Sequence, residues 1–219
     1  MIFVLNLGFY FNFILSFLIF GGLCTCKDFL NKEKFNIVKI QDKSSDDIYK
    51  TYKKILPLVF FNLFISSLPL SLLFYNLIDS KNLVNTNFSF YKFLFDIILY
   101  RFLIDLFFYI CHRTFHSKYF YKYHKVHHEI KAPIGISALY LHPVDFLFGN
   151  IIPIFLPCFI LQSHIYTIHF LLILTICDTI FVAHSGYKKI AEFHDIHHME
   201  FKYNYGTEVF MDKLLGTYK

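Results

Sequence analysis

The sequence predicts an all-α integral membrane protein, in which a bundle of about three transmembrane helices and a helical hairpin carries a histidine-rich helical cap on the cytosolic face. Two observations support this fold class. Hydrophobic residues make up 56% of the 219 residues and charged residues only 17%, whereas a soluble domain carries about 25% charged residues. In addition, long uncharged runs alternate with short polar stretches, and most of the histidines lie in the polar stretches.

The first two expected spans lie in the N-terminal part of the chain. Residues 2–23 form an uncharged apolar run, long enough for the roughly 20 residues that a membrane helix needs. The run lacks a preceding basic segment and a small-residue cleavage site, so we expect a retained anchor rather than a removed signal peptide. A lysine-rich stretch follows, and the uncharged run 55–78 forms the second span. We therefore expect two units, an N-terminal anchor with its polar segment (1–54) and a membrane domain (55–219).

A third expected span, at about 90–111, and a hairpin at 144–183 complete the bundle. The third span contains four charged residues, Lys92, Asp96, Arg101 and Asp105. Charge is costly in hydrocarbon, so these side chains should face the bundle interior or lie near an end of the helix. In the hairpin, Gln162, Ser163 and His164 interrupt the apolar pattern and mark its tip.

The distribution of basic residues predicts which polar stretches share a side of the membrane. With these spans, 18 of the 21 Lys and Arg residues fall on one side, because only Lys81, Lys92 and Arg101 lie elsewhere. The positive-inside rule assigns that side to the cytosol. The net charge of +5 thus follows from topology, and nucleic acid is not an expected partner. The same assignment brings all three histidine clusters to the cytosolic face.

Three histidine clusters carry the functional prediction. HRTFH contributes His112 and His116, HKVHH contributes His124, His127 and His128, and HDIHH contributes His194, His197 and His198. Residues three or four apart lie on one face of a helix, so each cluster can direct its imidazoles to one side. A zinc site needs about three or four ligands, so eight imidazoles suit two metal ions. Nitrogen donors fit iron, copper or zinc. The two hairpin histidines, His164 and His169, are expected to pack or cap instead.

The clusters, in this order and between these apolar segments, resemble the histidine boxes of the fatty acid hydroxylase and sterol desaturase superfamily of membrane di-iron enzymes. The resemblance covers residues 90–219. The segments HKVHHEIKAPIG (124–135), LYLHPVD (139–145), AHSGY (183–187) and HDIHHMEF, with MDKLLGT near the C-terminus, are similar to the sterol 4-methyl oxidase (methylsterol monooxygenase) branch.

The resemblance implies a set of iron ligands. In the family the box histidines bind two iron ions, which zinc can replace in a purified form, and this role carries over to the eight clustered histidines. His184 and His142 are expected as further ligands, and Asp105 is expected beside an imidazole that it orients. Phe193 stands where the family usually has another histidine. Only nine residues separate His184 from His194, where the family usually has a longer loop.

The resemblance also implies a reaction and its partners. It implies a multi-pass oxidoreductase of the endoplasmic reticulum membrane, a non-haem di-iron monooxygenase that uses dioxygen to oxidise a C–H bond of a lipid. In the sterol 4-methyl oxidase branch that bond belongs to the 4-methyl group of an intermediate of sterol biosynthesis. The sequence contains no G-x-G-x-x-G motif, so we expect electrons from NAD(P)H to arrive through a separate reductase and cytochrome b5.

Three alternatives remain open at this point. A fatty-acyl or sphingolipid hydroxylase, or a sterol desaturase, belongs to the same superfamily, and the residues that line the lipid site would distinguish these enzymes. A histidine-rich metal transporter belongs to another class, but it should place histidines along a path through the membrane rather than at one surface. The third alternative is a family member that has lost its activity through the short loop before HDIHH.

Overall fold

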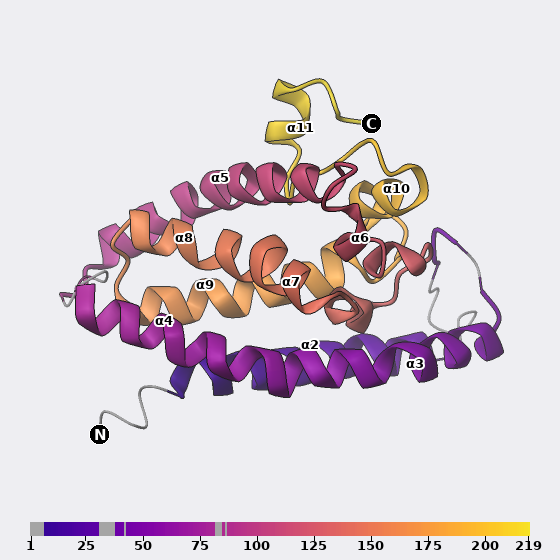
Figure 1. The fold of residues 1–219 in the computed structure, drawn as a ribbon, viewed down its shortest axis with the longest axis horizontal. Helices are drawn as coiled ribbons and strands as arrows, with labels where there is room; N and C mark the ends of the chain where they lie inside the picture. The colour runs from indigo at the N-terminus through magenta and orange to yellow at the C-terminus, as the bar shows by residue number, and fades with distance from the viewer. Residues whose placement is uncertain (1–6, 31–37, 42, 82–84, 86) are drawn as a thin grey trace.

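The computed structural model describes residues 7–30, 38–41, 43–81, 85 and 87–219. In this part of the chain every regular element is a helix, and the backbone pairs as β-structure only at two isolated bridges. Figure 1 shows that the long helices run along the long axis of the molecule in layers, with α8 and α9 between α5 on one side and α2, α3 and α4 on the other. The prediction of an all-α fold is confirmed.

The N-terminal helices form the outer layer. Helix α2 (Gly8–Asp28) corresponds to the expected anchor, of which residues 2–6 lie outside the described residues. Helix α3 (Ser45–Phe60), a π-helical turn (Phe61–Ser66) and α4 (Ser67–Lys81) follow one another without a break. This helix begins at Ser45 rather than at residue 55, because the Ser44 hydroxyl accepts a hydrogen bond from the Asp47 amide at 3.1 Å and caps it.

The expected third span is helix α5 (Phe90–Phe115). The carboxyl groups of Asp96 and Asp105 are buried in the bundle, and the Lys92 ammonium lies 2.7 Å from Asp96. The expectation that these charges face the interior or lie near an end is therefore met for Asp96, Asp105 and Lys92, whereas the mid-helix Arg101 is partly exposed. Four helical segments are long and apolar enough to cross a membrane: Gly8–Asp28, Ser45–Phe74, Pro143–Ile160 and Ile165–Ala183. Helix α5 is not among them because of its charged residues, although it lies against α8 inside the same bundle.

The expected hairpin is present. Its first arm joins α7 (Pro143–Asp145), a π-helical turn (Phe146–Ile151) and α8 (Ile152–Ile160), and its second joins α9 (Ile165–Asp178) to a π-helical turn (Thr179–Ala183). At the tip, the His164 imidazole caps α9 by accepting a hydrogen bond from the Tyr166 amide at 3.2 Å. His169 stacks on Phe9, with ring centroids 4.6 Å apart. Both hairpin histidines thus have the capping and packing roles expected of them.

The histidine-bearing segments gather at one end of the bundle. Short helix α6 (Tyr121–His124), a 3₁₀ turn (His127–Glu129), α10 (Glu192–Glu200) and the end of α5 meet there, below α11 (Phe210–Leu214) in Figure 1. A further 3₁₀ turn (Gly135–Leu139) leads back to the hairpin. The polar stretches that the charge pattern placed on one side of the membrane therefore do share one end, while the cytosolic identity of that end stays a prediction.

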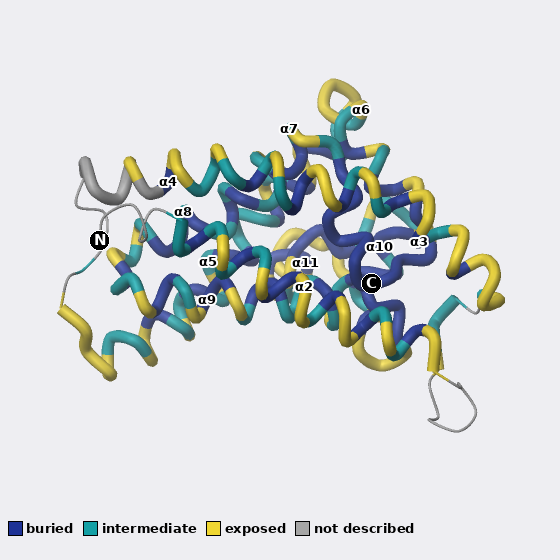
Figure 2. Tube along the Cα trace, turned by 90° about the horizontal axis from the view of Figure 1, so that it is seen from below, coloured by how far each residue is buried: buried dark blue, intermediate teal, exposed yellow. Residues whose placement is uncertain are grey.

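The surface of the bundle is that of a membrane protein. In Figure 2 the buried positions lie inside the bundle and around α10, and the outward-facing turns of the helices are exposed. Exposed positions on these turns include Leu15, Leu23 and Ile98. Large apolar side chains exposed over a wide area signal contact with lipid rather than with water. Together with the four candidate spans, they make the chain a multi-pass membrane protein.

A buried ionic cluster ties the N-terminal layer to the histidine end. The Asp28 carboxylate lies 2.6 Å from the Lys39 ammonium, and it accepts hydrogen bonds from the hydroxyl groups of Tyr52 and Tyr187, both at 2.9 Å. Lys39 also forms a β-bridge with Tyr187. Because Tyr187 lies three residues after His184, this cluster fixes the segment that follows that histidine.

We predict that Asp28→Asn lowers the free energy of unfolding by about 3–5 kcal/mol, because it leaves the buried Lys39 ammonium without its counter-charge. Denaturant unfolding of the purified protein in detergent would measure the change. Asp46→Asn, at an exposed position on α3, is the matched control and should change the stability by less than about 1 kcal/mol. Equal effects of the two substitutions would contradict the assigned role of Asp28.

Candidate metal centre

Nine histidines form two groups at the histidine end of the bundle, and within each group the ligating nitrogens all lie within 4.8 Å of one another. The first group has five members, His112, His116, His124, His128 and His197. The second group has four members, His127, His184, His194 and His198. Nine of the ten histidines predicted as ligands are thus brought together, and they separate into two sites.

The two H-x-x-H-H clusters are divided between the groups in opposite ways. From HKVHH, His124 and His128 join the first group and His127 joins the second. From HDIHH, the arrangement is reversed, because His197 joins the first group while His194 and His198 join the second. In each cluster the two histidines four residues apart therefore share a group, and the third histidine belongs to the other group. Each cluster therefore serves both sites, which sequence spacing alone did not reveal.

Backbone carbonyl groups fix the orientation of several rings. The Nδ1 atoms of His112, His197 and His184 lie 2.7, 2.7 and 2.8 Å from the carbonyl oxygens of Tyr205, Tyr203 and Thr179. A carbonyl oxygen can only accept, so Nδ1 of each ring carries the proton and donates it. A neutral imidazole has one N–H, which leaves the Nε2 lone pair of each ring free to bind a metal.

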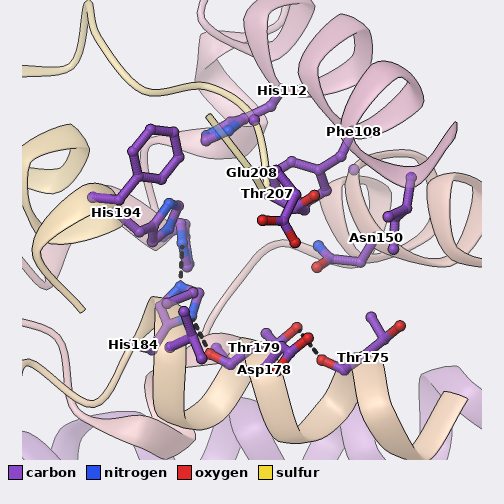
Figure 3. Close-up of a pocket in the computed structure, with 18 of the residues that line it drawn as sticks. Phe108, His112, Asn150, Thr175, Asp178, Thr179, His184, His194, Thr207 and Glu208 are labelled. Atoms are coloured by element: carbon purple, nitrogen blue, oxygen red, sulfur yellow. Dashed lines mark hydrogen bonds between the residues drawn. The ribbon is translucent and has the colours of Figure 1, made fainter. Parts of the chain in front are cut away.

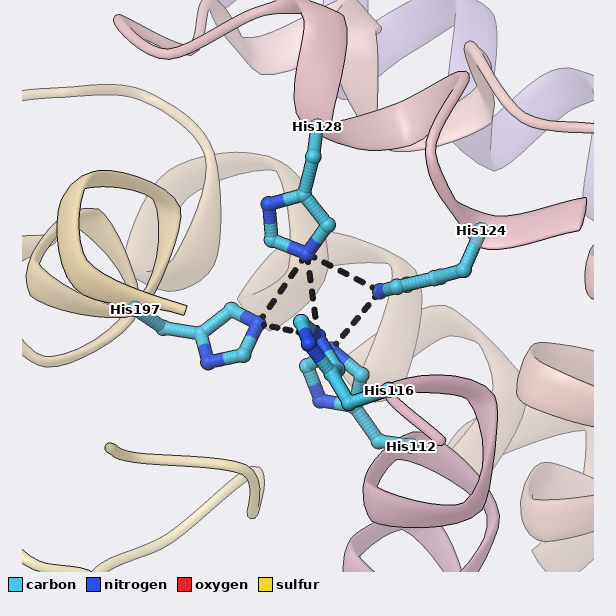
Figure 4. A group of neighbouring side chains, drawn as sticks. All are labelled: His112, His116, His124, His128 and His197. Atoms are coloured by element: carbon cyan, nitrogen blue, oxygen red, sulfur yellow. Dashed lines mark hydrogen bonds between the residues drawn. The ribbon is translucent and has the colours of Figure 1, made fainter. Parts of the chain in front are cut away.

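These lone pairs converge, as Figure 4 shows for the first group. In the second group the His127 Nδ1 donates to the Tyr140 carbonyl at 3.4 Å, and its Nε2 lies 3.2 Å from that of His184. Two lone pairs at this distance repel each other unless a cation lies between them. The Nε2 atoms of His194 and His198 are buried, and no polar partner reaches them in the described part of the chain. The donor set of each group therefore fits a metal ion.

Burial keeps these rings in the form that binds metals. Removal from water disfavours the charged imidazolium, and it lowers the pKa of His197 to about 3 and the pKa of His184 to about 4. At pH 7 both rings are neutral, so a proton cannot occupy the space between the converging lone pairs. A metal cation can.

A carboxylate group orients the His124 imidazole, but it belongs to Asp145 and not to Asp105, which the resemblance had implied. Asp145 Oδ2 lies 2.7 Å from the Nδ1 of His124. Asp105 instead accepts hydrogen bonds from the amides of Glu208 and Met211, at 2.8 and 2.9 Å. Seven residues of helix separate Asp105 from His112, about 10 Å along the axis, which is too far for a direct hydrogen bond. The signal that could have identified Asp145 was its place at the end of the LYLHPVD segment.

Asp105 acts on the first group through the loop that it holds. Asp212 accepts the amide hydrogens of Tyr205 and Gly206, at 2.9 and 2.7 Å. A Cβ on Gly206 would approach Asp105 Oδ1 to 2.2 Å and Asp212 Oδ2 to 3.0 Å, so only glycine fits between the two carboxylates. The Asp105 and Asp212 carboxylates thus clamp the loop around Gly206, and the loop places the Tyr205 carbonyl against His112.

His142 lies outside both groups, although the resemblance implied it as a ligand. Its Nδ1 accepts a hydrogen bond from the Val144 amide at 3.1 Å, so the ring caps α7. The short segment between His184 and His194, in contrast, does not separate these two residues. Their ring centroids lie 4.7 Å apart within the second group, so the shortened loop leaves both rings in place.

A cavity of about 260 Å³ opens beside the two groups. His112, His124, His127, His184 and His194 contribute to its wall, and Ile104, Phe108, Leu141 and Val182 line much of the remainder. Figure 3 shows His112, His184 and His194 at one side of this space, with Asn150, Thr207 and Glu208 at the other. The arrangement places metal-binding nitrogens next to an apolar chamber.

Comparisons with known proteins follow the same histidine segments. Residues 97–217 match the family model described as fatty acid hydroxylase. The chain is 35% identical to the human fatty acid hydroxylase domain-containing protein 2 over 134 residues, which cover 59% of this chain and 40% of the human protein. It is 38% identical to methylsterol monooxygenase 1 of Rattus norvegicus over 130 residues, covering 52% of this chain and 43% of the rat protein.

A third relative covers more of the chain. A very-long-chain aldehyde decarbonylase of Oryza sativa subsp. indica is 31% identical over 204 residues, 84% of this chain and 75% of the rice protein. The chain thus spans less than half the length of the human and rat relatives. No solved structure matches it.

We predict that His197→Ala and His127→Ala, one from each group, each lower the metal content of the purified protein by at least about half, because each removes a ligand from one of two sites. Elemental analysis by mass spectrometry would measure the loss. His164→Ala, which removes a helix cap far from both groups, should leave the metal content unchanged. The division into ligands and packing residues is wrong if all three variants behave alike.

Proposed function

The chain belongs to the fatty acid hydroxylase family, and on this premise we propose that it is a membrane-bound non-haem di-iron oxygenase that uses dioxygen to oxidise a C–H bond of a lipid. One observation carries the proposal. Two groups of five and four imidazoles, all buried except the half-buried His116, have converging lone pairs and border a largely apolar cavity at one end of a membrane bundle. The expected ligand set is the nine grouped histidines, without His142.

The protein contributes ligation, orientation and a dry chamber. When bound, iron would supply the capacity to reduce dioxygen and to oxidise an unreactive C–H bond. The carbonyl groups of Tyr205, Tyr203 and Thr179 hold ligand rings with Nε2 directed inward, and Asp145 does the same for His124. The apolar walls exclude water and align the hydrocarbon part of the substrate beside the histidines.

For the substrate we propose the 4-methyl group of a sterol intermediate. The support is the similarity to the rat methylsterol monooxygenase over 130 residues, about half of the chain. A second candidate is a long-chain aldehyde or fatty-acyl lipid, favoured by the broader coverage of the rice decarbonylase. A metal transporter is disfavoured, because the grouped histidines lie together at one end of the bundle and not along a path through it.

We further propose that this end of the bundle faces the cytosol at the endoplasmic reticulum, where cytochrome b5 and its reductase deliver electrons from NAD(P)H. Exposed lysines on the 118–131 segment surround the second histidine cluster: Lys118, Lys122, Lys125 and Lys131. A cationic surface of this kind attracts an acidic donor. An electron donor bound there would lie close to His124 and His128 of the first group.

Metal analysis and lipid turnover test the oxygenase proposal together. We expect about two iron ions per chain in protein purified without chelators. The loaded protein, supplied with dioxygen and a reducing system, should consume a 4-methyl sterol, and deletion of the gene should make 4-methyl sterols accumulate. Iron-loaded protein that oxidises no lipid would contradict the oxygenase. An unchanged sterol profile with a changed pool of long-chain aldehydes or acyl lipids would favour the second candidate.

The docking proposal makes a separate prediction. The double substitution Lys122→Glu and Lys125→Glu should slow reduction of the iron-loaded protein by cytochrome b5 by roughly tenfold or more, because it reverses the local charge. Stopped-flow absorbance at low ionic strength would measure the rate of reduction. Added salt screens the charges, so it should reduce the difference in rate between the wild-type protein and the double variant. Lys213→Glu on α11, also exposed, is the control. Docking at these lysines is excluded if the double variant and the control are reduced at the same rate.

A further inference from the structure

The cavity has a polar wall that the metal centre does not use. Arg101 on α5 forms ion pairs with Asp178 at the end of α9 and with Glu208 in the loop before α11. All three residues line the cavity, and they come from three separate elements. The cluster therefore joins α5, α9 and the C-terminal loop along one side of the chamber, with its three side chains partly exposed.

The charge of this wall selects against anions. Arg101 is the only lysine or arginine among the described residues that line the cavity, and its guanidinium is already paired with two carboxylates. The cluster carries one positive and two negative charges. At this wall, away from the histidine groups, a lipid carboxylate or phosphate would thus meet no free cation and an excess of negative charge, and both disfavour its binding there.

The same wall offers unused hydrogen-bonding groups. In Figure 3 the Asn150 amide projects into the cavity between Glu208 and Thr175. No other described residue hydrogen-bonds to this amide or to the Thr207 hydroxyl, and both residues line the cavity. An amide presents a donor and an acceptor side by side, and a hydroxyl group also donates and accepts. The free groups therefore complement an uncharged hydroxyl.

The location of Asn150 relates this hydroxyl to the metal centre. Asn150 lies in the same helical arm as Asp145, five residues further on, and Asp145 contacts His124 of the first group. Five residues of helix span roughly 6–8 Å along the axis. A hydroxyl bound at Asn150 would hold carbons only a few bonds away from it beside the histidines. The cavity of about 260 Å³ is smaller than the roughly 300–1,000 Å³ of pockets that enclose whole ligands, so it takes one end of the lipid.

We propose that Asn150 and Thr207, backed by the Arg101–Asp178–Glu208 cluster, bind an uncharged hydroxyl group of the lipid substrate and exclude free fatty acids. The inference rests on the proposed function for the oxidation itself, but hydroxyl recognition is a property of binding alone. Asn150 is in this proposal a specificity-determining residue.

Equilibrium binding of radiolabelled lipids to the metal-loaded protein in nanodiscs tests the proposal. The probes are a 4-methyl sterol and its 3-methyl ether, with octadecanol and stearic acid as a second pair. We expect the wild-type protein to prefer the free hydroxyl of each pair by about 3- to 10-fold or more, the effect of one to two hydrogen bonds. In Asn150→Leu the ratio of the affinities for the sterol and its methyl ether should fall to near one, while the metal content stays unchanged. Asn87→Leu, at an exposed position before the start of α5 and thus at the end of that helix remote from His112, is the control and should keep the preference.

A gain of binding provides the second test. The double substitution Asp178→Asn and Glu208→Gln leaves Arg101 with an unopposed positive charge, so stearic acid should bind several-fold more tightly than to the wild-type protein. The proposal is overturned if the wild-type protein shows no preference for hydroxyl-bearing probes, or if Asn150→Leu retains it. Turnover measurements distinguish the two proposals. If the protein oxidises lipids but shows no preference for a hydroxyl group, only the proposal of hydroxyl recognition is contradicted. If the protein shows the preference but oxidises no lipid, only the oxygenase proposal is contradicted.

Discussion

Nine imidazoles whose lone pairs point toward one another impose the constraint on which the rest of this structure depends. Neutral rings at such short distances repel, and burial removes the water that would otherwise separate them. Five of the rings are held by their Nδ1 atoms, four of them by backbone carbonyl groups and His124 by the Asp145 carboxylate. The loop that carries the Tyr205 carbonyl is itself fixed, since Asp105 and Asp212 clamp the backbone around Gly206. A cation bound between the nitrogens of each group would replace this repulsion with attraction.

Helix α5 shows how a membrane bundle can accommodate charge for this purpose. Its acidic and basic residues do not form a water-filled path, because each one has a specific structural partner. Lys92 pairs with Asp96 toward one end, Arg101 joins two neighbouring elements, and Asp105 holds the C-terminal loop. The helix is consequently too polar to be identified as a span by composition, yet it carries His112 and His116 to the metal centre.

Much of the fold could be predicted from the sequence, because apolar run length and histidine spacing are local properties. The hairpin, the gathering of the clusters at one end and the packing of His169 followed in this way. The division of each H-x-x-H-H cluster between two groups could not, since it depends on how α10 faces the 124–128 segment. The family resemblance drew attention to Asp105, which is near His112 in sequence. The carboxylate that contacts an imidazole is Asp145, which approaches His124 only through tertiary packing.

The crossed assignment of the clusters has a consequence for biosynthesis. Four members of the first group lie between residues 112 and 128, so they leave the ribosome together, well before α10 is made. The second group has only His127 until residue 184 and its successors have been synthesised. Neither group is therefore complete until α10 has been synthesised and has packed against the 112–128 segment.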